Sequence, residues 1–199
     1  MDKKEFAENN YSANEKSQKK GKVYKSATYL SKIAMLSAAA VLLLYIEFPI
    51  FPITPWLKLN VSDFPSLLAS FMFGPISGVI VNGVKVGLCL LLRGTSTGFV
   101  GELSNLVSGA IYALLAGIIY KIKKDKFGAV LSLVVSSAMF VISMWLFNRF
   151  ALFPLYGIEK NSYSPLLLWT ILFNCIKVIV TGLITFVVYK SIHKLFNKF

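Results

Sequence analysis

The sequence predicts an all-α, polytopic membrane protein with six transmembrane helices. Of its 199 residues, 56% are hydrophobic and only 15% are charged, whereas soluble domains average about 45–50% apolar and about 25% charged residues. The apolar residues come in long runs separated by short polar turns, and a helix needs about 20 such residues to cross the bilayer. This composition excludes a disordered chain and a disulfide-rich secreted protein.

The lysines indicate how the chain is oriented. They gather before the first apolar run, in one short loop at 121–126, and in the C-terminal tail. The positive-inside rule places all three segments in the cytoplasm, so both termini are expected there. We expect residues 1–27 to be a disordered, basic cytoplasmic tail and residues 28–199 to be the six-helix transmembrane domain. Nucleic-acid binding is excluded, because no basic patch is interleaved with aromatic residues.

The first two helices are bounded by proline and glycine. The first is expected at about residues 29–48, where a loop with three prolines follows that cannot be helical in its middle. The second begins at Ser62 and Asp63, whose side chains can cap the free N–H groups of the first turn. It is short, because Gly74 and Pro75 end it.

Four further apolar runs, separated by polar or glycine- and proline-containing turns, predict four more helices. They are expected at about residues 75–92, 99–120, 127–150 and 164–189. With the N-terminus inside, the loop after the first helix, the polar turn at 93–98 and a long loop at 151–164 lie outside. The connections on the inner side are tight and those on the outer side are long, which favours a pocket that faces outward beneath the loops.

The strongest polar stripe lies on the last helix. Asn174, Lys177 and Thr181 are spaced i, i+3 and i+7 and therefore share one face. At about 1.5 Å per residue, Lys177 lies near the middle of the membrane, where an ionisable group costs several kcal/mol unless it faces the bundle interior. The sequence favours a ligand-facing role for this stripe over an interhelical polar contact.

Other polar residues are weaker candidates. Asn148 lies near the outer end of the fifth helix, and its amide offers a donor beside an acceptor, which suits a heterocycle edge with C=O next to N–H. Glu102 and Asn105 belong to a stripe typical of helix packing, and we place them near the mouth of the pocket. For Lys85, within the third helix, a structural partner and a functional role both remain open.

Ala34 and Ala38 form a small-xxx-small pair on the first helix, which favours close packing against another transmembrane helix. The partner helix can be internal or part of a separate subunit.

No glycine-rich phosphate loop is present, so we expect the chain not to hydrolyse ATP itself. Because His193 is the only histidine, a histidine-based zinc site is not expected, and no catalytic constellation is found.

Three short motifs carry a resemblance to a known family. They are Leu-Lys-x-x-x-Ser-Asp-x-Pro at residues 57–65, Gly-Glu-Leu-Ser-Asn at 101–105, and Asn-x-x-Lys at 174–177. Together with the six short helices, they resemble the substrate-binding (S) subunits of energy-coupling factor vitamin transporters over residues 29–196. Within this family the resemblance is closest to the riboflavin-specific members.

The resemblance implies a function, partners and a site. Such a subunit captures riboflavin with high affinity outside the bacterial cell membrane and delivers it inward when coupled to a transmembrane subunit and two ATP-binding subunits. Riboflavin is then a transported substrate and no cofactor is implied. The Ala34 and Ala38 pair matches the motif that docks on the coupling subunit. The family's pocket maps onto Ile53, Thr54, Pro55, Trp56, Leu57, Asn148, Asn174 and Lys177.

Three alternatives remain at this stage. The same fold can capture another vitamin, such as thiamin or pantothenate. A small membrane enzyme needs activated groups, which the sequence does not offer. A pore needs polar lining on most helices, and the first two have almost none.

Overall fold

The computed structural model describes residues 26–95 and 97–196, with side chains as far as Ser191. The predicted tail at 1–27 lies outside these residues, apart from its last two, which begin the first helix. The chain divides into two compact units, Met1–Met35 and Leu36–Phe199. The described part of the first unit is entirely helical.

The six predicted helices are all present, with bounds close to those expected. Five are long and apolar enough to cross a membrane, and the exception has only ten residues. At about 1.5 Å per residue, those ten residues cover about half of a hydrocarbon core about 30 Å thick. The helices are Ser26–Tyr45, α2 (Phe64–Phe73), α3 (Pro75–Arg93), α4 (Val100–Ile122), α5 (Lys126–Phe147) and α7 (Tyr163–Phe196).

The proline-rich segment after the first helix folds into a small hairpin. Strands β1 (Phe48–Pro49) and β2 (Lys58–Leu59) pair antiparallel, with Phe48 opposite Leu59. The segment between them, residues 50–57, is called the hairpin loop below. Its prolines prevent a helix, and the ring of Phe51 packs against Trp169 of α7 with ring centroids 5.0 Å apart. The hairpin loop is therefore anchored on α7.

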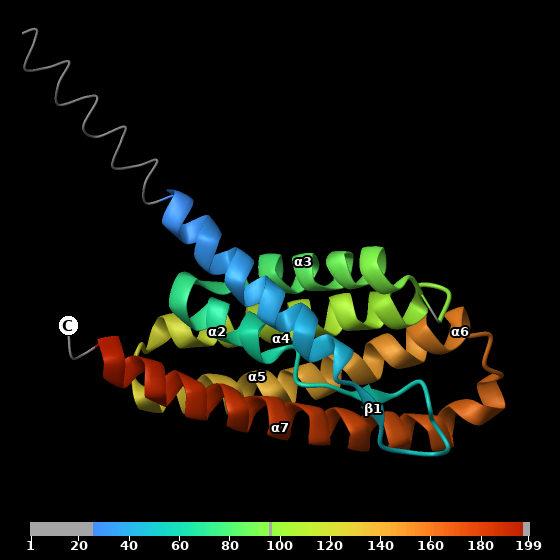
Figure 1. Ribbon diagram of the computed structural model, residues 1–199. Coiled ribbons are helices and arrows are strands. Elements are labelled where there is room, and N and C mark those ends of the chain that lie inside the picture. Colours follow the sequence, from blue (N-terminus) through green and yellow to red (C-terminus); the bar gives the residue numbers. More distant parts are fainter. Residues whose placement is uncertain (1–25, 96, 197–199) are drawn as a thin grey trace, which may run out of the picture. The chain divides into compact units, whose positions relative to one another are not determined.

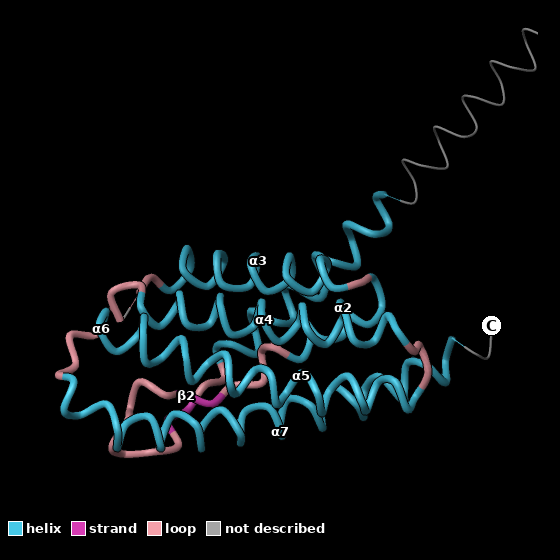
Figure 2. Tube along the Cα trace, turned by 180° about the vertical axis from the view of Figure 1, so that it is seen from behind, coloured by secondary structure: helices cyan, strands magenta, loops and turns pink. Residues whose placement is uncertain are grey.

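Helix α4 packs between α3 and α5, while α7 packs against α5 and α2 (Figure 1). Seen from behind, the hairpin loop crosses α7 (Figure 2). Aromatic side chains fill part of the core, where the phenol groups of Tyr120 and Tyr189 lie 2.6 Å apart and Phe71 packs against both rings. These contacts join α2, α4 and α7.

One part of the prediction is wrong, because the segment 151–164 is not a simple loop. The fifth helix continues through a π-helix (Asn148–Leu152) into α6 (Phe153–Leu155), and a 3₁₀ turn follows at Lys160–Ser162. Within the π-helix the N–H of Phe153 donates to the carbonyl of Asn148, five residues earlier. Pro154 explains the widening, since its ring would clash with the carbonyl four residues earlier in an α-helix.

Gly78 allows α2 and α3 to approach closely, which gives a first prediction. A Cβ at this position would overlap the Ser70 Oγ and lie 2.5 Å from the Ser66 carbonyl oxygen. We expect Gly78→Ala to destabilise the protein by about 1–3 kcal/mol, because the helices must separate. Thermal unfolding in detergent measures this. Gly83→Ala is the control on the same helix, since nothing lies within 4 Å of a Cβ added there. A larger loss of stability in Gly83→Ala than in Gly78→Ala would contradict the packing argument.

Candidate functional site

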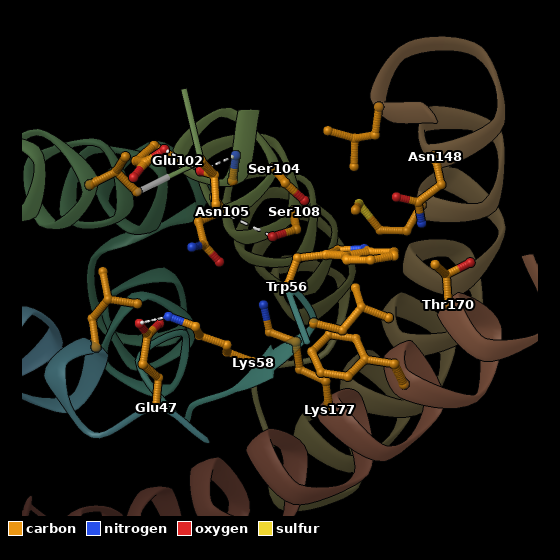
Figure 3. A pocket seen from close by; sticks show the side chains of 18 of the residues that line it. Glu47, Trp56, Lys58, Glu102, Ser104, Asn105, Ser108, Asn148, Thr170 and Lys177 are labelled. Carbon is orange, nitrogen blue, oxygen red and sulfur yellow. Dashed lines mark hydrogen bonds and ion pairs between the residues drawn. The ribbon is translucent and has the colours of Figure 1, made fainter. Parts of the chain in front are cut away.

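A pocket lined by both polar and apolar side chains lies within the unit formed by residues 36–199. The hairpin loop, α3, α4, the π-helix and α7 all contribute to its lining (Figure 3). Its cavity volume is about 120 Å³. Pockets for small molecules typically measure about 300–1,000 Å³, so a ligand of vitamin size needs side chains of the lining, Trp56 among them, to move.

The pocket brings together predicted residues from four separate segments. Those that line it are Trp56, Leu57, Glu102, Asn105, Asn148, Asn174 and Lys177. Three predicted residues of the hairpin loop lie outside this lining. Thr54 is fully buried, and its backbone N–H and C=O close two successive turns of the loop. Ile53 and Pro55 are exposed.

Trp56 projects into the pocket from the hairpin loop. Figure 3 shows its indole in the space bordered by Ser108, Asn148 and Thr170. Its ring centroid lies 6.2 Å from that of Tyr156, which follows α6. Burial raises the pKa of Tyr156, so its phenol stays neutral near pH 7. An aromatic plane thus lies among polar side chains at the centre of the site.

Two buried asparagine amides face this space. Asn148 and Asn174 are 3% and 5% exposed. Neither amide group forms a side-chain hydrogen bond with any other described residue. Each amide carries two donors and an acceptor with two lone pairs. The lining therefore offers uncommitted hydrogen-bonding groups from both the π-helix and α7.

A buried ion cluster lies at the end of the Lys177 side chain. The Nζ of Lys177 is 2.8 Å from Asp63 Oδ2, and the Nζ of Lys85 is 2.6 Å from Asp63 Oδ1. Lys85 also donates to Ser62 Oγ at 3.2 Å. Lys85, therefore, has a structural partner. The predicted helix-capping role of Asp63 is wrong, because its side chain makes no cap hydrogen bond and instead lies between two ammonium groups.

A second ionic group joins three elements at the side of the pocket. Glu47 Oε1 lies 3.0 Å from Lys58 Nζ and 2.6 Å from Arg93 Nη1, and all three residues line the pocket. The contacts tie the segment between the first helix and β1 to β2 and to α3. Nearby, the hydroxyls of Thr95 and Thr97 both donate to the Glu102 carboxylate at 3.0 Å.

Comparison with known proteins settles the family. The model of the "ECF transporter, substrate-specific component" family, where ECF is the energy-coupling factor, matches residues 28–189. The chain belongs to this family. The predicted fold and the family resemblance are confirmed, and this S component is a multi-pass membrane protein by the length and composition of its helices.

Relatives of this S component include two named riboflavin transporters. Riboflavin transporter RibU of Staphylococcus aureus (strain TCH60) is 39% identical over 163 residues, which cover 82% of each chain. Riboflavin transporter FmnP of Bacillus subtilis (strain 168) is 29% identical over 125 residues, or 62% of this chain and 66% of that one.

A solved structure shares the fold of this S component. It is described as the S component of a bacterial ECF transporter and aligns with a TM-score of 0.75 at 36% identity. The alignment covers 86% of this chain and 98% of that one. The fold of this chain is thus that of a solved S component.

Sequence reasoning missed Asp63, Glu47, Lys58 and Arg93 as residues of the S component's site. A signal for Asp63 was available. Two lysines within apolar helices need a buried counter-charge, because an uncompensated buried charge costs several kcal/mol. Asp63 begins the short helix between long apolar runs and meets that need. The Glu47 group had no comparable signal, since Glu47 and Arg93 lie near helix ends, where charges are common, and Lys58 lies in the segment between two helices.

Proposed function

We propose that this S component binds riboflavin with high affinity from outside the bacterial cell membrane. Coupled to a transmembrane subunit and two ATP-binding subunits, it then delivers the vitamin inward. The observation that carries the proposal is the pocket in which Asn148, Asn174 and Lys177 present polar groups around an aromatic residue. The likeness to named riboflavin transporters supports the choice of vitamin.

The chemistry of riboflavin fits these residues. Its isoalloxazine ring system is a flat apolar plane with a uracil-like edge on which C=O and N–H groups alternate. Asparagine amides are complementary to such an edge, and the ammonium of Lys177 can donate to a carbonyl oxygen. Trp56 offers an aromatic face for stacking. We infer that the indole stacks on the bound flavin or moves aside with the hairpin loop.

We infer that riboflavin is cargo and that the chain is not an enzyme. Among the described residues, the charged side chains of the lining are engaged with partners. Lys177 pairs with Asp63, Lys58 and Arg93 pair with Glu47, and Glu102 accepts from threonine hydroxyls. Catalysis by proton transfer needs a group poised to give or take a proton, and this arrangement favours binding.

The test is the colour and fluorescence of the purified protein. We expect a yellow preparation with flavin absorbance and one riboflavin per chain. After the vitamin is removed, added riboflavin should quench tryptophan emission, and Trp56→Phe should reduce the quenching because Trp56 lines the pocket. Thiamin and pantothenate serve as controls. A colourless protein whose emission responds to either control but not to riboflavin would refute the proposed substrate.

Docking of the coupling subunit gives a separate prediction. Ala38, in the second unit, is exposed, and Ala34 lies one helical turn earlier in the first. We expect Ala34→Trp or Ala38→Trp to spare riboflavin binding but to block cellular uptake, because a bulky ring prevents close helix packing. Leu183→Trp, on the exposed apolar face of α7, is the control. Normal uptake by both alanine variants would remove the docking role.

A further inference from the structure

The buried ion cluster holds more positive than negative charge. One carboxylate, that of Asp63, faces two ammonium groups, at 2.6 Å for Lys85 and 2.8 Å for Lys177. Each ammonium takes a different carboxylate oxygen, so neither lysine has the whole counter-charge. With all three groups ionised, the cluster carries a net charge of about +1 by simple addition of formal charges.

The two lysines differ in what they face. Lys85 is fully buried, is absent from the pocket lining, and has a second partner in Ser62, whose hydroxyl also donates to Asn60 Oδ1 at 2.7 Å. Lys177 lines the pocket, and Asp63 is its one partner within the described part of the chain. An ammonium group has three donors. The remaining donors of Lys177 are therefore free for a ligand.

We propose that Lys85 determines the charge of the part of the pocket around Lys177. By holding one oxygen of Asp63, Lys85 leaves the ammonium of Lys177 incompletely neutralised where it meets the ligand. The pocket therefore favours a ligand edge that accepts hydrogen bonds, and favours it more strongly when that edge carries negative charge. Lys85 touches no ligand and acts through Asp63. Without Lys85, Asp63 and Lys177 form a neutral pair, and the net positive charge of this cluster disappears.

The inference rests on the proposed function only where riboflavin serves as the probe. Addition of two electrons and one proton to oxidised riboflavin gives the anionic reduced form. A positive charge beside the flavin stabilises this anion more than the neutral oxidised form. Bound riboflavin should therefore be easier to reduce in the wild-type pocket than in a pocket that lacks the charge.

The first experiment measures the affinity for riboflavin and the two-electron potential of the bound flavin, by dithionite titration against a reference dye. We expect Lys85→Met to weaken binding of oxidised riboflavin by up to about tenfold, because the ammonium of Lys177, once neutralised by Asp63 alone, forms a weaker hydrogen bond to a carbonyl oxygen of the flavin. Binding of the reduced anion should weaken by about a further tenfold, which lowers the potential by about 30 mV. Lys126→Met removes an exposed lysine at the start of α5 and is the control.

The double variant Asp63→Asn/Lys85→Met restores the net charge, and we expect it to recover the wild-type potential. A merely structural role of Lys85 predicts no such recovery. An unchanged potential in a Lys85→Met protein that still binds riboflavin would overturn the proposal. If Lys85→Met does not fold, the double variant decides: a potential equal to wild type supports the proposal, and a fall of about 30 mV contradicts it.

A second measurement needs no flavin. Cys89 lines the pocket and lies one helical turn after Lys85, while Cys175 can be replaced by alanine to leave Cys89 as the one thiol. We expect the ratio of rates with anionic and cationic methanethiosulfonate reagents to fall about tenfold in Lys85→Met, because the local positive charge is lost. A wild-type protein that binds no riboflavin refutes the proposed function, whereas an unchanged ratio overturns the role of Lys85.

Discussion

Replacing Asp63 with alanine is expected to destabilise the folded protein by about 3–5 kcal/mol, the cost of leaving buried charges without their partner. The variant removes the shared carboxylate, and the ammonium groups of Lys85 and Lys177 then face each other in the interior. Their side chains are 0% and 6% exposed, so solvent compensates little for the lost carboxylate. Thermal and denaturant unfolding of the protein in detergent measure the loss.

Asp125→Ala is the matched control, because Asp125 also precedes a helix. Its side chain accepts a hydrogen bond from the N–H of Gly128, as an N-cap residue does. That bond lowers the pKa of Asp125, so the cap contributes stability at neutral pH and loses it as the pH falls through the lowered pKa. At pH 7 we expect a clearly smaller loss than for Asp63→Ala; equal losses would contradict the role of the buried cluster.

The affinity for riboflavin is expected to fall by about 10–100-fold in Asn174→Ala and in Lys177→Met. Each variant removes hydrogen-bonding groups from the buried lining, and hydrogen bonds to charged groups contribute about 1.5–3 kcal/mol. Lys177→Met leaves Asp63 paired with Lys85, so the fold should persist. Fluorescence titration or calorimetry with purified protein measures the affinity.

Thr181→Val is the control for these two variants. Thr181 shares the face of Asn174 and Lys177 but lies deeper, is fully buried and is absent from the pocket lining. Its hydroxyl has no hydrogen-bond partner in the described part of the chain, so the substitution leaves no group unsatisfied. We expect unchanged affinity. Wild-type affinity in both Asn174→Ala and Lys177→Met would remove α7 from the site.

The helices were predictable because their signals are local. Long apolar runs and glycine or proline breaks set the bounds of α2 and α3. The segment after Asn148 was not predictable in the same way, because Pro154 is typical of a loop as well as of a widened helical turn. The difference depends on whether the five-residue hydrogen bond from Phe153 forms, and that bond leaves no periodic pattern in the sequence.

The site was predictable where helical geometry governs it. The spacing of Asn174 and Lys177 places both on one face of α7, and both line the pocket. Loops carry no such periodicity, so the sequence could not separate Trp56, which lines the pocket, from Ile53, which is exposed. The pairing of Asp63 with both lysines depends on the packing of α2 against α3 and α7, which no local pattern records.

The ten residues of α2 have a consequence for how the protein meets lipid. In hydrocarbon every backbone polar group must be satisfied, so an irregular segment is tolerated at membrane depth only where protein surrounds it. Because α2 covers only about half of the hydrocarbon core, the non-helical segment before it can lie below the bilayer surface. Protein shields that segment, since Asn60, Ser62 and Asp63 are at most 3% exposed. Acyl chains therefore contact the sides of helices, while protein encloses Asp63 and the two lysines paired with it at the same depth.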